Sequence, residues 1–101
     1  MKKIIEGNST PVTMKFYAPY NKAKIPVTAE YCVFDVDSNT MIVSHVSFSP
    51  TDFKYVLDID PEVNKIIDPT KTEEYRKVVV KWTDDKNYVG VSPFIYKIVK
   101  I

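Results

Sequence analysis

Two side chains of the sequence, Cys32 and His45, are of the types that a nucleophilic catalytic pair requires, and each is the only one of its kind in 101 residues. A thiol attacks as the thiolate, and a neighbouring imidazole or basic group lowers its pKa. Cys32 instead lies in the apolar run from Tyr31 to Phe34, where a cysteine behaves as a small buried hydrophobe. His45 belongs to a different strand-like run. We therefore expect no catalytic Cys–His pair, and a single cysteine cannot form a disulfide within the chain.

The segment from Asp35 to Asn39 begins with alternating acidic residues, like the opening of a calcium-binding loop. In such a loop the sixth position is glycine and the twelfth is glutamate. Here those positions hold Thr40 and Val46. We interpret the segment as a turn at the end of a strand, whose Asp and Asn side chains cap their own backbone. The sequence therefore predicts no metal site.

A second acidic group, Asp58, Asp60 and Glu62, has the spacing that places carboxylates side by side on a strand. Paired carboxylates perform acid–base catalysis where a pocket drives their pKa values apart, and the sequence indicates no such pocket. We interpret the group as a solvated strand end. The chain also lacks a glycine-rich phosphate loop, a Cys/His set with metal-ligand spacing and a Gly-x-Ser-x-Gly elbow. We expect a protein without catalytic residues or cofactors.

Tyrosine is abundant, with seven residues beside five phenylalanines and one tryptophan. Tyrosine is enriched at protein interfaces because its ring buries a large area at low entropic cost and keeps a polar hydroxyl. Strands also favour tyrosine irrespective of any interface, so both explanations remain open. The core cannot hold every tyrosine, and the candidate interface residues are Tyr17, Tyr20, Tyr75 and Tyr88.

The 14 basic and 13 acidic residues nearly cancel and are interleaved along the chain. Binding nucleic acid requires a clustered excess of Lys and Arg, so we expect no nucleic-acid partner. No window approaches the length of a membrane span, which predicts no membrane insertion. The apolar stretch at Ile4 and Ile5 is too short for a secretory signal. We therefore expect a chain that folds in the cytoplasm.

The candidate side chains named above must be positioned by strands, because the dominant hydrophobic period of the sequence is two residues. From Val12 to Ala18 every second residue is apolar, and Phe53 to Ile59 repeats the pattern, which predicts one dry and one wet face. The runs from Val27 to Val36, from Val78 to Trp82 and from Phe94 to Ile101 carry apolar residues on both faces. Such runs are typical of the middle of a sheet or of a covered surface.

Turn-forming residues separate these runs, and Asp37 to Asn39 and Asp84 to Asn87 predict hairpin connections. The longest irregular stretch, Pro61 to Thr72, has room for one helical turn. About seven strands, with turn signals about every eight to twelve residues and no long helical period, predict an all-β immunoglobulin-like or fibronectin-III-like antiparallel sandwich. No repeat or linker is present, so residues 1–101 are predicted to form one such domain.

Four features follow one another along the chain. An N-terminal strand with a polar motif is at Ile4–Asn8, and a strand ending in an Asp-rich hairpin is at Tyr31–Asp37. A Tyr-containing strand then leads to a Trp at Tyr75–Trp82, and a closing strand is at Ser92–Val99. This order resembles small immunoglobulin-like modules in the structural proteins of tailed bacteriophages. The sequence departs from that pattern at Ser38-Asn39, where the hairpin glycine is missing, and in a long insertion around Asn64 to Thr72. The resemblance implies a place on a capsid, neck or baseplate and no catalytic residues.

Together, the residues and the resemblance predict a non-enzymatic structural or attachment module. It would be a virion accessory or connector protein, made in the host cytoplasm, that contacts other virion structural proteins or its own copies. The contacts would use edge strands or an aromatic patch. The alternative is a carbohydrate- or receptor-binding adhesion domain whose aromatic side chains stack on sugar rings. A small enzyme subunit is a third hypothesis, disfavoured by the scarcity of nucleophiles.

Overall fold

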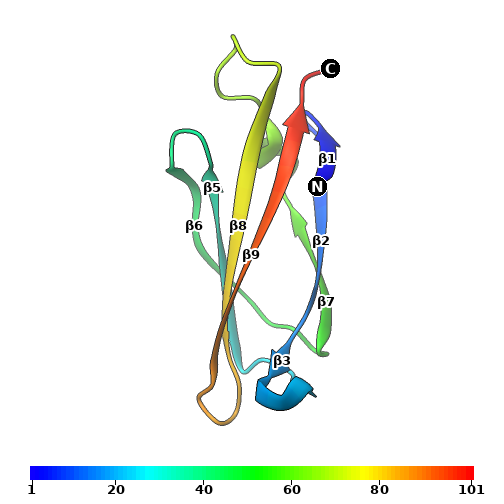
Figure 1. Cartoon of the computed structure of the whole chain (residues 1–101), viewed down its shortest axis with the longest axis vertical. Coiled ribbons are helices and arrows are strands. Elements are labelled where there is room, and N and C mark those ends of the chain that lie inside the picture. The colour runs from blue at the N-terminus through cyan, green and yellow to red at the C-terminus, as the bar shows by residue number, and fades with distance from the viewer.

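The computed structural model describes every residue from Met1 to Ile101 and contains strands and 3-10 turns but no α-helix. The chain is therefore all-β, as the alternating pattern predicts. The elements in chain order (Figure 1) are β1 (Lys2–Ile5), β2 (Thr10–Lys15), β3 (Tyr17–Ala18), η1 (Pro19–Asn21), β4 (Lys22–Ala23), β5 (Thr28–Asp35), β6 (Thr40–Phe48), β7 (Lys54–Ile59), η2 (Pro61–Asn64), β8 (Glu73–Thr83) and β9 (Val89–Val99).

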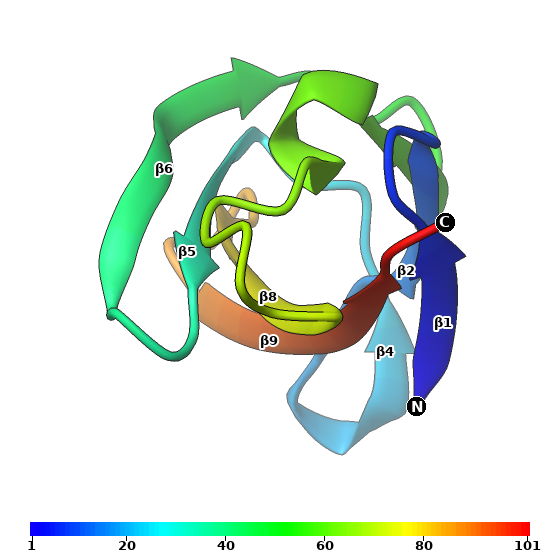
Figure 2. The same ribbon diagram turned by 90° about the horizontal axis from the view of Figure 1, so that it is seen from above.

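Five strands form the main sheet in the order β1–β9–β8–β5–β6. Strand β2 pairs with β7 in a second layer, and β3 pairs with β4 in a short ribbon. Figures 1 and 2 show the β2–β7 pair opposite the main sheet, with the strands running along the long axis. The molecule measures 47 × 21 × 20 Å, so loops gather at two distant ends.

The hydrophobic core lies between the main sheet and the β2–β7 pair. Alternation predicts a dry face at Val12, Met14, Phe16 and Ala18, and all four side chains are buried. The inward face of the main sheet supplies Ala29, Val33, Val78, Val80, Trp82, Tyr96 and Ile98. Because each fully buried Val, Ile or Phe side chain contributes roughly 1.5–3 kcal/mol, this shared interior is what holds the two layers together.

A buried ionic cluster closes one end of the core. The Arg76 side chain is fully buried, and its Nη1 and Nη2 atoms each lie 2.9 Å from a carboxylate oxygen, of Asp35 and Glu74 respectively. Its Nε donates to the carbonyl oxygen of Val63 at 3.1 Å, and Nη2 donates to that of Lys65 at 2.8 Å. Such a buried pair is tolerable only when its hydrogen bonds are satisfied. The cluster joins β5, β8 and the connection after η2.

Asn64 ties the long β7–β8 connection to the core. Its Nδ2 donates to the carbonyl oxygen of Asn8 at 2.7 Å and to Oγ1 of Thr10 at 2.8 Å. Its Oδ1 accepts the hydroxyl of Tyr96 at 2.6 Å. The stretch expected to be irregular is therefore a 3-10 turn at Pro61–Asn64, fixed to the core by the Asn64 amide, followed by a coil whose backbone N–H groups at Ile67 and Asp68 donate to the Glu74 carboxylate.

Pairing at one edge differs from the expected sheet. Strand β1 runs parallel to β9, with Lys2 opposite Tyr96 and Ile5 opposite Val99, so the prediction of a purely antiparallel arrangement is wrong there. The reason is that β1 and β9 come from opposite ends of the chain, and no hairpin forces them to be antiparallel. The hairpins predicted at Asp37–Asn39 and Asp84–Asn87 are confirmed, since β5–β6 and β8–β9 pair antiparallel across them.

Candidate functional site

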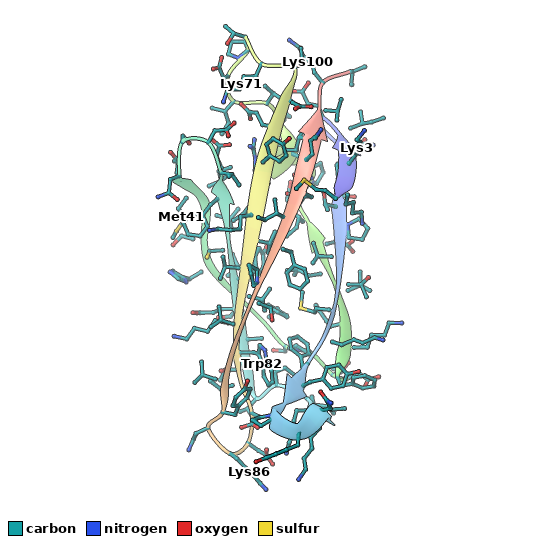
Figure 3. All side chains as sticks on the ribbon, viewed as in Figure 1. Lys3, Met41, Lys71, Trp82, Lys86 and Lys100 are labelled. Atoms are coloured by element: carbon teal, nitrogen blue, oxygen red, sulfur yellow. The ribbon has the colours of Figure 1, made fainter.

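Three of the four candidate interface tyrosines meet at one end of the molecule. Tyr17 lies on β3, Tyr20 on η1 and Tyr88 just before β9, and Tyr20 and Tyr88 line the same cleft. Tyr75 pairs with Lys97 near the far end of β8 and does not join them. Figure 3 shows the two ends, with Trp82 and Lys86 at one and Lys3, Lys71 and Lys100 at the other. We call the first the aromatic end and define it by Tyr17, Tyr20, Phe53, Trp82 and Tyr88.

Tyr20 is the most exposed large side chain of the aromatic end, at 95%. Its backbone is left-handed, with φ 65° and ψ 29°, and Asn21 follows with φ 58°. A bulky residue is rare in this region, and such strain costs on the order of 1–3 kcal/mol. The β3–β4 ribbon supports the strained turn by pairing Tyr17 with Ala23. The fold therefore holds the Tyr20 ring out in solvent.

The β8–β9 turn carries Tyr88 to the same end, and Asp84 organises it. One Asp84 oxygen accepts the backbone N–H groups of Lys86 and Tyr88, both at 2.8 Å. Burial tends to raise the pKa of Asp84, but these two N–H groups and the Lys24 ammonium more than offset it and lower the pKa overall. Asn87 adopts φ 62°, so Asn takes the place of glycine in this turn.

A row of aromatic rings connects the core to this surface. The rings of Phe16 and Trp82 meet edge to face with centroids 5.3 Å apart, and those of Trp82 and Tyr88 meet at 5.6 Å. Tyr17 packs beside Phe53 from the β6–β7 connection, with centroids 6.0 Å apart. Edge-to-face pairs are the favoured aromatic geometry. Tyr88 is therefore held in place by the buried ring of Trp82, and Tyr17 by the half-buried ring of Phe53.

A shallow cleft of about 200 Å³ lies between the two loops of the aromatic end. Its lining consists of Ala18, Pro19, Tyr20, Lys22, Lys24, Asp84, Lys86 and Tyr88. The Lys24 ammonium lies 3.3 Å from an oxygen of Asp85 and so links the two loops. Tyrosine rings beside ammonium groups can stack on planar or apolar groups and attract carboxylates. The cleft therefore has side chains suited to binding a planar or apolar group or a carboxylate.

The Cys32 and His45 side chains both line a small cleft of about 110 Å³ on the outward side of the main sheet. Cys32 is buried, and its thiol lies 3.9 Å from the carbonyl oxygen of Val79. Burial, with a smaller contribution from Glu30, raises the pKa of Cys32, whereas a nucleophile needs a lowered one. His45 Nδ1 lies 3.6 Å from a Glu30 oxygen.

The acidic residues singled out in the sequence have structural contacts. Asp35 binds Arg76 and accepts the Ser38 hydroxyl at 2.6 Å, while Asp60 accepts the N–H of Glu62 at 2.8 Å at the start of η2. Asp58 is exposed.

No three His, Cys, Asp or Glu side chains gather as they would around a metal ion. None of the helical segments has the length and hydropathy needed to cross a membrane.

Comparisons with protein-family models, with curated proteins and with solved structures each found no match to this chain.

Proposed function

We propose that the chain is a non-enzymatic attachment or connector module that binds another protein through its aromatic end. The observation that carries the proposal is the Tyr20 ring, 95% exposed on a strained left-handed backbone. Strain of this kind persists where the surrounding structure enforces it, and it gathers at functional sites. Tyr88 lines the same cleft as Tyr20, and Tyr17 lies on β3 directly before η1, so the aromatic end offers the rigid aromatic contacts that interfaces favour.

The fold within this proposal is an immunoglobulin-like sandwich. The strand order β9–β8–β5–β6 matches the G–F–C–C′ sheet of such domains, and the β2–β7 pair matches strands B and E. The aromatic end then consists of the B–C, F–G and C′–E connections. In variable immunoglobulin domains, loops at one end of the sandwich carry recognition, because a rigid scaffold positions them.

The proposed setting is a bacteriophage particle, where the partner is another virion structural protein. The support is the order of motifs that resembles small phage modules, together with the all-β fold. The test is to purify particles from cells that express the chain, and to search gradient fractions by mass spectrometry. Co-sedimentation of the chain with intact particles is expected. Its complete separation from them at low salt would contradict the proposal.

The cleft favours one alternative, binding of a carbohydrate. Tyr20 and Tyr88 line it beside Lys22, Lys24 and Lys86, and aromatic rings can stack on sugar faces while ammonium groups donate hydrogen bonds. An array of purified glycans separates the two functions. Selective glycan binding that is lost in Tyr20→Ala would replace the virion proposal by an adhesion function, and an array without binding would remove the alternative.

A further inference from the structure

The shallow cleft of the aromatic end concentrates positive charge. Its eight lining residues include three lysines, Lys22, Lys24 and Lys86, and one aspartate, Asp84, which gives a net charge of +2. The whole chain has a net charge of only +1. The cleft therefore carries more positive charge than the chain as a whole, and a cleft lined by one sign of charge attracts ligands of the opposite sign.

The one carboxylate of the lining is engaged by its own turn. Asp84 is buried, and its Oδ1 accepts the backbone N–H groups of Lys86 and Tyr88, both at 2.8 Å. Hydrogen bonds from backbone N–H groups stabilise a carboxylate charge where it is. Asp84 therefore fixes the shape of the β8–β9 turn, and the charge left to attract a ligand is that of the lysines.

Two of the three ammonium groups have no ionic partner. Lys24 pairs with Asp85 across the two loops, at 3.3 Å. Neither Lys22, on β4, nor Lys86, in the β8–β9 turn, forms an ion pair within the chain. The two lysines come from the two loops that bound the cleft, so an anionic group seated there lies close to both.

Tyrosine rings supply the apolar part of the cleft. Tyr20 is held out on its left-handed turn, and Tyr88 packs edge to face on the buried ring of Trp82. Ala18 and Pro19 add further apolar atoms to the lining. Apolar walls exclude water, which strengthens the attraction between an ammonium group and an anion. The cleft therefore suits a ligand that joins an anionic group to a short apolar stem.

We propose that this cleft receives an acidic side chain, Asp or Glu, of the protein that the aromatic end binds. The inference rests on the proposed function and names the chemistry of the partner at the same site. A carboxylate accepts hydrogen bonds from the ammonium groups of Lys22 and Lys86, and its methylene groups pack against the tyrosine rings. Contacts of this kind steer association and make it depend on salt.

The first test titrates the purified chain with short poly-L-glutamate and follows the backbone amides by NMR. At about 0.1 M salt we expect the amides of Tyr20, Lys22, Lys86 and Tyr88 to shift. The shifts should vanish near 1 M salt, where the screening length falls to about 3 Å. The double variant Lys22→Gln/Lys86→Gln should weaken the binding at least about fivefold, since it removes two exposed charge pairs.

The matched control is the double variant Lys3→Gln/Lys100→Gln. Both lysines are exposed and lie at the other end of the molecule from Lys86 (Figure 3), so the variant loses the same charge far from the cleft. Its affinity for poly-L-glutamate should be unchanged, and circular dichroism confirms that both double variants fold. Equal losses in the two variants, shifts confined to the other end, or no shifts at all would overturn the proposal. Shifts with a sialylated oligosaccharide but not with poly-L-glutamate would assign the cleft to an acidic sugar instead.

Sedimentation with purified particles separates this inference from the proposed function. We expect Lys22→Gln/Lys86→Gln to lose association at low salt, as Tyr20→Ala does, while the control variant keeps it. If Tyr20→Ala loses association and the Lys22→Gln/Lys86→Gln variant keeps it, the aromatic end binds the particle by another chemistry, and only the acidic side chain is wrong. Association that survives in both variants would contradict the proposed function and this inference together.

Discussion

The indole ring of Trp82 fills the space that a side chain at Gly90 would occupy, because a Cβ built on Gly90 would collide with three atoms of the ring. The two residues face each other across β8 and β9, directly below the turn that carries Tyr88. The missing side chain leaves room at Gly90 for the Trp82 ring, which also meets Tyr88 edge to face. One glycine thus links the core to the position of a surface tyrosine.

Gly90→Ala tests this relationship. The added methyl group must displace the Trp82 ring, so we expect a loss of about 1–3 kcal/mol in the free energy of unfolding, the usual cost of overpacking. Denaturant unfolding followed by Trp82 fluorescence measures it. Ser92→Ala, two residues along the same strand, is the control and should change stability little. Equal stability of Gly90→Ala and the unaltered chain would show that the ring moves aside freely.

Arg76→Ala should be among the most destabilising substitutions in the chain. It leaves the Asp35 and Glu74 carboxylates buried without their cation, which costs about 3–5 kcal/mol. A domain of this size has on the order of 5–15 kcal/mol in total, so the variant should lie close to unfolding. Lys71→Ala removes the exposed Lys71–Asp37 bridge, which spans 2.9 Å, and should cost under about 1 kcal/mol. Similar losses in urea melts of both variants would contradict the assignment.

The Glu74 carboxylate should make stability fall in acid. Burial tends to raise its pKa, but the backbone N–H groups of Ile67 and Asp68 and the Arg76 guanidinium outweigh that effect and lower it below the ordinary 4.5. A lowered folded-state pKa gives stability that is complete above pH 4.5 and is lost as the pH falls through the folded value. Denaturant melts from neutral pH into acid measure it.

The comparison variants are Glu74→Gln and Glu62→Gln. Glu74→Gln should be less stable at neutral pH and should lose less on acidification, since its side chain does not titrate. Glu62→Gln removes only an exposed carboxylate 3.1 Å from Lys65 and should keep the steep acid dependence. If Glu74→Gln loses stability in acid as steeply as the unaltered chain, other carboxylates account for the acid dependence.

Tyr96 should make stability fall at the other end of the pH range, in alkali. Burial raises the pKa of its hydroxyl from 10.0 to about 12. The unfolded chain therefore ionises first, and stability should fall between pH 10.0 and about 12. Tyr96→Phe removes this contribution but leaves Asn64 Oδ1 without its donor, which costs about 1–3 kcal/mol at neutral pH. Tyr20→Phe, on an exposed ring, should change neither the stability at neutral pH nor its fall at high pH in the same melts.

Much of the scaffold could be predicted from the sequence, because burial follows a period of two along β2 and β8. The hairpin turns could be predicted from Asp, Ser and Asn, which tolerate the required backbone. The parallel β1–β9 pair could not, since pairing between distant strands leaves no local signal. The two register shifts in the pairing of β6 with β5, on either side of Val33, were missed for a related reason, because they depend on how the two strands meet.

The Arg76 cluster was also missed, although the chain held a signal for it. Arg76 and Glu74 continue the same alternation as Val78, Val80 and Trp82, so they belong to the dry face. Charged residues on a dry face require partners, and Asp35 at the end of an apolar strand is the matching one. At the aromatic end, Tyr17, Tyr20 and Tyr88 could be named from residue type alone. Their meeting, and the separation of Tyr75, depend on which loops share an end of the sheet.

The contact proposed at the aromatic end is tested most directly by placing a photo-crosslinking residue, p-benzoylphenylalanine, at position 20 and, in a second variant, at position 75. Both tyrosines were candidates, but only Tyr20 lies at the aromatic end. After irradiation of assembled particles, we expect position 20 to yield one covalent adduct with a structural protein of the particle and position 75 to yield none. Adducts at position 75 alone, or equal yields at both positions, would contradict the claim that the aromatic end makes the contact.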